Sequence, residues 1–128
     1  MAVIKAFECI RPDEKVADRV AALPYDVYNR EEALNEVERE PLSFLAIDRA
    51  ETQFDSSVDT YADCVYDKAR ELLDSRIADG TFITDTDKAY YVYELTMNGR
   101  TQTGIAACAS IDAVSYTHLR AHETCADL

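Results

Sequence analysis

The chain has 128 residues, enough for one domain with a buried core. It carries 25 acidic and 13 basic residues, for a formal net charge of -12, and it lacks the clustered Lys and Arg that bind nucleic-acid backbones or anionic membranes. Its apolar runs are too short to cross a bilayer and its start lacks the features of a secretory signal, so we expect a cytoplasmic protein with no nucleic-acid and no membrane partner.

The N-terminal segment predicts a strand followed by a short helix. β-Branched and aromatic side chains favour a strand over residues 2–10. Asp13 is a suitable cap for a helix that runs to about Leu23, where Pro24 stops it. The segment 24–27, Pro-Tyr-Asp-Val, is stiff, because proline fixes its own φ and restrains the residue before it.

A capped helix and a buried strand are expected next. Asn29 and Glu32 have the spacing of a capping box, so we expect a helix that begins there and ends before Pro41. The mostly apolar run 43–47 predicts a short buried strand. The polar stretch 49–57 has no periodicity and predicts a loop.

The second half predicts one long helix and a hairpin. Apolar residues recur with a period near 3.6 over residues 58–78, as in an amphipathic helix. A short strand is expected at 82–83, followed by strands over 89–97 and 100–110 that Asn98-Gly99 joins as a two-residue hairpin. The order of elements predicts an α+β fold with a mixed or antiparallel sheet, about three helices and a C-terminal β-hairpin at Asn98-Gly99.

The cysteines and histidines give no sign of a metal or redox site. Cys9, Cys64 and Cys108 lie among apolar neighbours, so small buried side chains are favoured over a nucleophile or a disulfide. The histidines, His118 and His122, both lie near the C-terminus, and no closely spaced pair of zinc ligands occurs. We therefore expect no metal site, and the cofactor stays unknown.

The last segment, residues 114–128, changes in character. It has no clear period, and Val114–Thr124 resembles a translated sequencing-adapter peptide that recurs at the ends of unrelated predicted proteins. We therefore expect residues 1–113 to be the N-terminal part of a larger α+β protein, and residues 114–128 to be a non-native tail. The alternative is an ordinary native C-terminus.

Several short segments follow one another in an order that is specific when they are taken together. They are residues 4–7, 10–12, 21–27, 43–45, 91–93, 102–105 and 109–112. This ordered set resembles the domain-of-unknown-function family 1015, whose members are uncharacterised bacterial and archaeal proteins. Members are much longer than this chain, so the resemblance implies a missing C-terminal majority. Some members are labelled by analogy to partition-type proteins, a fold group that includes free-serine kinases, but such an analogy says little about function.

The stiff segment around Tyr25 and Asp26 is the sharpest candidate site. A phenol and a carboxylate on a rigid turn between helices could face a cleft. Asp26 would then orient a substrate hydroxyl, act as a general base or hold a metal-bound phosphate. The alternative is structural: Tyr25 is a core or lid residue, and Asp26 accepts hydrogen bonds from nearby backbone N–H groups.

Two further places suit the recognition of a phosphate or carboxylate. Arg11 follows a strand end, where a fixed guanidinium can bind an anion, and its alternative is a surface ion pair with a neighbouring acid. Arg100 and Gln102 follow the hairpin turn, beside Gly104, which inside a strand marks a bulge or a close approach by a ligand. The alternative for this second group is a solvated strand face.

These residues lead to two hypotheses. The first is an enzyme that acts on a small phosphorylated or carboxylated metabolite, including by nucleotide-dependent phosphoryl transfer, with Asp26 as the catalytic residue and Arg11, Tyr25, Arg100 and Gln102 as substrate-binding residues. Its partner would be a small-molecule anion or a nucleotide. The second is a non-catalytic ligand-sensing or protein-interaction module, because residues 1–113 contain no histidine and no arrangement typical of a nucleophile. The oligomeric state stays open.

Overall fold

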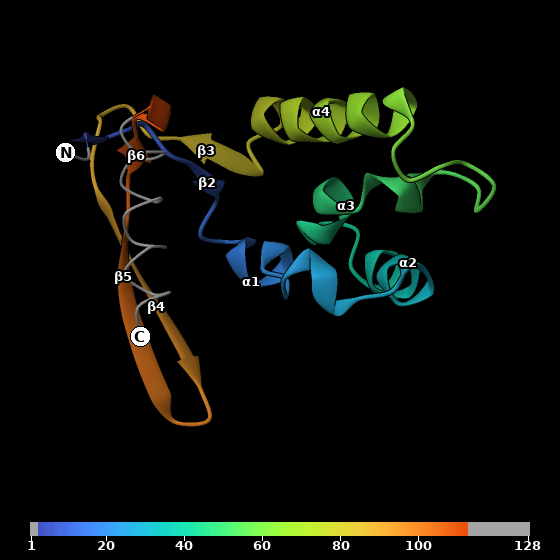
Figure 1. Cartoon of the computed structure of the whole chain (residues 1–128), viewed down its shortest axis with the longest axis horizontal. Helices are drawn as coiled ribbons and strands as arrows, with labels where there is room; N and C mark the ends of the chain where they lie inside the picture. The colour runs from blue at the N-terminus through green and yellow to red at the C-terminus, as the bar shows by residue number, and fades with distance from the viewer. Residues whose placement is uncertain (1–2, 113–128) are drawn as a thin grey trace. The chain divides into compact units, whose positions relative to one another are not determined.

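The computed structural model of the chain describes residues 3–112 (Figure 1). These residues belong to two compact units. The helical unit comprises residues 10–84, and the hairpin unit comprises residues 3–9 together with 85–112. The fold is α+β, as predicted. The predicted non-native tail from residue 114 lies outside the described residues.

The helical unit contains a short strand pair and four α-helices. Its elements in chain order are β2 (Ile10–Pro12), α1 (Ala17–Val20), the 3₁₀ turn η1 (Tyr25–Val27), α2 (Arg30–Arg39), α3 (Leu45–Asp48), the 3₁₀ turn η2 (Ala50–Gln53), α4 (Asp63–Ala78) and β3 (Phe82–Thr84). Strands β2 and β3 pair antiparallel, with Arg11 opposite Ile83.

Helix α2 begins with the predicted capping box. The Asn29 side chain accepts a hydrogen bond from the Glu32 backbone N–H at 2.8 Å, and the Glu32 carboxylate accepts one from the Asn29 N–H at 2.9 Å. The two bonds satisfy donors that a helix start otherwise leaves without partners. The helix ends at Arg39, before Pro41, as predicted.

The prediction of a strand over residues 43–47 is wrong, because residues 45–48 form helix α3 and residues 43–44 lie in the turn before it. Backbone N–H groups of Ala46 and Ile47 donate to carbonyls three residues earlier, at 3.0 and 2.9 Å. A short apolar run fits a buried helix as well as a buried strand, so periodicity alone does not separate the two. The run is buried as expected, since Leu45 is 0% and Ala46 2% exposed.

The core of the helical unit lies between α2, α3 and α4. It consists of Ala33, Val37, Leu45 and Ala46, with Tyr28 and Leu72 packed against them. Burying a leucine side chain completely contributes about 2 kcal/mol, so Leu45 is the largest apolar contribution within this cluster. These contacts hold α3 and the segment after it in place.

Arg76 of α4 supports the turn before α3 from inside the unit. It is 6% exposed, and its guanidinium donates to the carbonyl oxygens of Pro41 at 2.6 Å, Leu42 at 3.1 Å and Ser43 at 3.4 Å. The guanidinium also lies 5.9 Å from the centroid of the Phe82 ring. Desolvation lowers the pKa of Arg76, but its carbonyl partners compensate part of the cost of burying the charge.

The long helix begins later than predicted. Helix α4 starts at Asp63, whereas apolar periodicity suggested a start near residue 58. Two acidic side chains explain the difference: Asp55 accepts from the Ser57 N–H at 2.9 Å and Asp59 from the Tyr61 N–H at 2.7 Å. Such local bonds compete with helical ones and favour turns. Helix α1 is likewise shorter than predicted, and η2 occupies part of the predicted loop.

The hairpin unit confirms the predicted turn. Strands β4 (Tyr91–Met97) and β5 (Arg100–Ala106) pair antiparallel, and Asn98 and Gly99 between them have φ values of 52° and 77°. Positive φ at both central residues is the requirement of a type I′ turn, for which Asn-Gly is well suited. Figure 1 shows β4 and β5 as a long two-stranded ribbon. In the same unit, β1 (Ile4–Lys5) pairs with β6 (Cys108–Ala109).

Burial of the cysteines differs from the prediction. Cys64 and Cys108 are exposed and Cys9 is half-buried. Cys64 precedes the buried Val65 on α4, and the helical rotation of about 100° per residue turns it away from the core. Within residues 3–112, no helix has the length and apolar character needed to span a membrane.

Candidate functional site

Tyr25 and Asp26 lie on the wall of a cleft in the helical unit with a volume of about 430 Å³. Three segments complete the wall: residues 47–51 from the end of α3 into η2, Thr60 and Tyr61 before α4, and Val65, Tyr66 and Ala69 on α4. The cleft thus joins segments that lie more than twenty residues apart in the sequence.

Within the described residues, Tyr25 is not in the core and Asp26 does not accept backbone hydrogen bonds, whereas the role of Tyr25 as a lid stays a prediction. The Tyr25 side chain is 59% exposed and is therefore not a core residue. Asp26 is exposed, and its carboxylate accepts no hydrogen bond from any residue in the range 3–112. The carboxylate therefore remains accessible to a ligand in the cleft.

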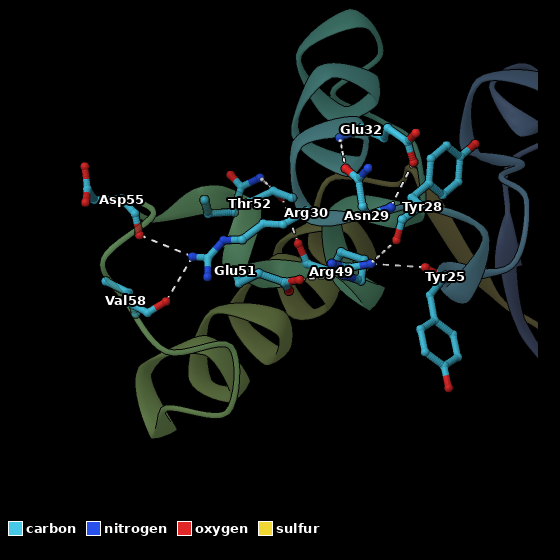
Figure 2. A network of polar contacts seen from close by, with 11 residues as sticks. Tyr25, Tyr28, Asn29, Arg30, Glu32, Arg49, Glu51, Thr52, Asp55 and Val58 are labelled. Carbon is cyan, nitrogen blue, oxygen red and sulfur yellow. Dashed lines mark hydrogen bonds and ion pairs between the residues drawn. The ribbon is translucent and has the colours of Figure 1, made fainter.

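Arg49 holds the turn that carries these two residues (Figure 2). Its Nη1 donates to the carbonyl oxygen of Tyr25 at 3.2 Å and to that of Tyr28 at 2.8 Å. Its Nε donates to Glu51 Oε1 at 2.5 Å, and the Glu51 side chain is only 2% exposed. The guanidinium therefore ties η1 to η2 and fixes one wall of the cleft against the other.

Arg30 fixes the loop that leads to the opposite wall. Its Nη2 donates to the carbonyl oxygens of Asp55 at 3.3 Å and Val58 at 2.9 Å, as Figure 2 shows. The loop then enters the turn that presents Tyr61. Arginine suits this role because its planar fork of donors can hold several carbonyls at once.

The electrostatics of the cleft are dominated by acids. Its lining includes the carboxylates of Asp26, Asp48 and Glu51 and the guanidinium of Arg49. Although Asp48 is exposed overall, partial desolvation raises the pKa of its carboxyl group above the ordinary aspartate value. A carboxyl group with a raised pKa in a cleft is a candidate for proton transfer. The Nη2 atom of Arg49 makes no hydrogen bond within residues 3–112, so it can contact a ligand.

The other predicted site residues do not line this cleft. Arg11 lines a separate groove of about 200 Å³ beside Val20, Phe44 and Leu73. Arg100 and Gln102 belong to β5 in the hairpin unit. Of the predicted site residues, the structure therefore brings only Tyr25 and Asp26 together.

The close approach expected at Gly104 is made by a side chain of the protein. Gly104 lies opposite Tyr93 in the β4–β5 ladder. A Cβ atom at this position would be 2.3 Å from Cζ of the Tyr93 ring, so the ring occupies the space that any larger residue needs. Arg100 and Gln102 are exposed on the same strand, as a solvated strand face requires.

Sequence reasoning missed Arg49 and Glu51 because residues 49–57 were expected to be a simple loop, and it missed Asp48 because that residue belonged to no predicted element. The signal was a charged Asp-Arg-Ala-Glu segment directly after a buried apolar run. Among residues 3–112, no three His, Cys, Asp or Glu side chains gather as a set of metal ligands.

Comparisons with known proteins identify the family. Residues 4–127 match the model of a family described as a protein of unknown function, DUF1015. Searches of curated proteins and of solved structures found no match. The matched range includes most of the segment after residue 113, which lies outside the described residues. Because the match covers nearly the whole sequence, the chain belongs to the DUF1015 family.

Proposed function

We propose that the chain contributes the cleft of an enzyme that acts on a small phosphorylated or carboxylated metabolite, by nucleotide-dependent phosphoryl transfer. One observation carries the proposal. Asp26 presents a carboxylate with no hydrogen-bond partner among residues 3–112, on a turn that Arg49 holds, in a cleft that also contains Asp48. A rigid mount for an accessible carboxylate is what positioning of a substrate hydroxyl requires.

Each cleft residue has a distinct role in this proposal. Asp26 accepts the proton of the substrate hydroxyl while the new O–P bond forms and the nucleotide's terminal P–O bond breaks. Partial desolvation raises the pKa of Asp48, so its carboxyl group keeps a proton to a higher pH than an ordinary aspartate does. The Nη2 atom of Arg49 contacts the anionic group of the substrate.

The test is ligand-induced thermal stabilisation of Asp26→Asn beside Asp67→Asn. Asp67 is an exposed aspartate on α4 outside the cleft, so its variant is a matched control. A ligand at a hundred times its dissociation constant adds about 2.7 kcal/mol of stability. We expect Mg·ATP with small hydroxy acids to stabilise the parent and the control, and Asp26→Asn to lose that response at unchanged intrinsic stability. A lowered intrinsic melting temperature with an intact ligand response would instead assign Asp26 a structural role.

A second candidate, a protein-interaction module, is favoured by the hairpin. Val92, Leu95, Met97 and Ile105 are 63–76% exposed on β4 and β5. Within residues 3–112 no third strand pairs with this ribbon. Open strand edges and exposed apolar side chains favour association. Sedimentation of the parent and of Leu95→Thr tests this candidate: it requires association that the variant weakens, and a monomeric parent would count against self-association.

A further inference from the structure

Three tyrosines line the candidate cleft and stay exposed. The exposed fractions of Tyr25, Tyr61 and Tyr66 are 59%, 78% and 57%. They come from η1, the loop before α4, and α4 itself, so three separate segments each bring a phenol ring to the same hollow. The face of an aromatic ring carries negative potential and attracts cations.

A nearly buried carboxylate in the same cleft, that of Glu51, also favours a positively charged ligand group. Glu51 is 2% exposed and lines the cleft. Only its Oε1 is engaged, by Arg49, and its Oε2 accepts no hydrogen bond within residues 3–112. Among the described residues no buried side-chain nitrogen or oxygen lacks a hydrogen-bond partner, so this Oε2 atom is reached by solvent. An ammonium group in the cleft would donate to it in place of water.

A purely anionic ligand fits the same surroundings poorly. Among the described residues Arg49 is the one basic residue of the wall, and its Nε and Nη1 atoms already donate to Glu51, Tyr25 and Tyr28. Only Nη2 is left for an anion, in a cleft that the carboxylates of Asp26 and Asp48 also line. Repulsion by carboxylates in a partly desolvated cleft would oppose a ligand that brings only negative charge.

We infer that the ligand of this cleft carries an ammonium group together with its phosphate or carboxylate. The ammonium lies among the tyrosine rings and the carboxylates, and the anionic group reaches Arg49 Nη2. This inference rests on the proposed function and narrows its substrate class to small amino-bearing metabolites.

The probes are O-phosphoethanolamine and n-propyl phosphate, which have similar size and the same phosphate but differ in the ammonium group. We would measure their affinities for the full 128-residue chain by isothermal titration calorimetry. A cation–π contact combined with charge pairing predicts that O-phosphoethanolamine binds about tenfold more tightly. Equal affinities for the two probes would overturn the inference and leave the proposed function standing. If neither probe binds, both the inference and the proposed function fail for phosphorylated metabolites.

Three substitutions test the tyrosines themselves. Tyr66→Leu keeps apolar volume but removes the aromatic face, so we expect most of the discrimination to vanish. Tyr66→Phe keeps the ring and should keep the discrimination. Because Tyr66 is more than half exposed, neither change removes a core residue, and Tyr61→Leu serves as a second variant at an even more exposed position. Discrimination that survives both leucine variants would contradict the role of the tyrosines.

Discussion

The buried ion pair between Arg49 and Glu51 offers the sharpest test of how the cleft is held together. Replacing Arg49 by Met removes a charge-assisted bond to a carboxylate that is 2% exposed, and it frees the carbonyls of Tyr25 and Tyr28. Removing one partner of a fully buried ion pair costs about 3–5 kcal/mol. The Arg49 side chain is itself 16% exposed, so water screens part of this loss and we expect about 3 kcal/mol.

The assay is urea denaturation of four proteins: the parent, Arg49→Met, Glu51→Gln and the double variant Arg49→Met/Glu51→Gln. Once Glu51 carries no charge, replacing Arg49 should lower the free energy of unfolding by a smaller amount. The double variant should therefore be about 1–2 kcal/mol more stable than the summed losses of the two single variants predict. Arg19→Met is the control, since Arg19 pairs with Glu40 through two bonds at 3.0 and 3.1 Å but is half exposed. Its substitution should cost far less.

A cost for Arg49→Met below about 1 kcal/mol would refute this reasoning, because it would place the pair among ordinary surface contacts. Costs that add to within about 0.5 kcal/mol in the double variant would also refute it, since independent sites behave in that way.

Three further predictions concern other contacts. Gly104→Ala should destabilise the protein by less than about 1 kcal/mol in urea, because its Cβ would meet only the outer end of the half-exposed Tyr93 ring, at 2.3 Å, and that side chain can turn away; the cost should vanish in a Tyr93→Leu background. Arg76→Met should cost about 2–4 kcal/mol by thermal denaturation, because three carbonyls before α3 lose their donor, and a cost like that of an exposed arginine would contradict this. Tyr91 donates to Asp85 at 2.7 Å, which raises its pKa, so the stability it contributes should be complete below pH about 10 and be lost as pH rises toward that raised value. The difference in unfolding free energy between the parent and Tyr91→Phe should therefore shrink at alkaline pH. A difference that widens at alkaline pH would contradict this prediction.

Local signals predicted the parts of the fold that local chemistry determines. The capping box at Asn29 and Glu32 needs only residues three apart, and the turn at Asn98-Gly99 needs only two residues that accept positive φ. The segment 43–47 was predicted wrongly because its burial, which was recognised, does not specify helix or strand.

The candidate site was predictable only in part, since its other members depend on tertiary contacts. Tyr25 and Asp26 were recognisable from the stiffness that Pro24 imposes. The role of Arg49 was not, because its hydrogen bonds reach 21 and 24 residues back along the chain. The place of Arg11 at a strand end suggested an anion ligand. Only the tertiary structure shows that Arg11 lines a groove separate from the Tyr25–Asp26 cleft.

The central claim is that the cleft around Tyr25 and Asp26 binds a small metabolite. The most direct measurement is the change in backbone amide chemical shifts when O-phosphoethanolamine and Mg·ATP are titrated into the isotope-labelled chain. We predict saturable shifts that concentrate in residues 25–28, 47–51 and 60–69, the segments that line or hold the cleft. Shifts that concentrate instead around Arg11 or along the hairpin, or no shifts at millimolar ligand, would contradict the claim.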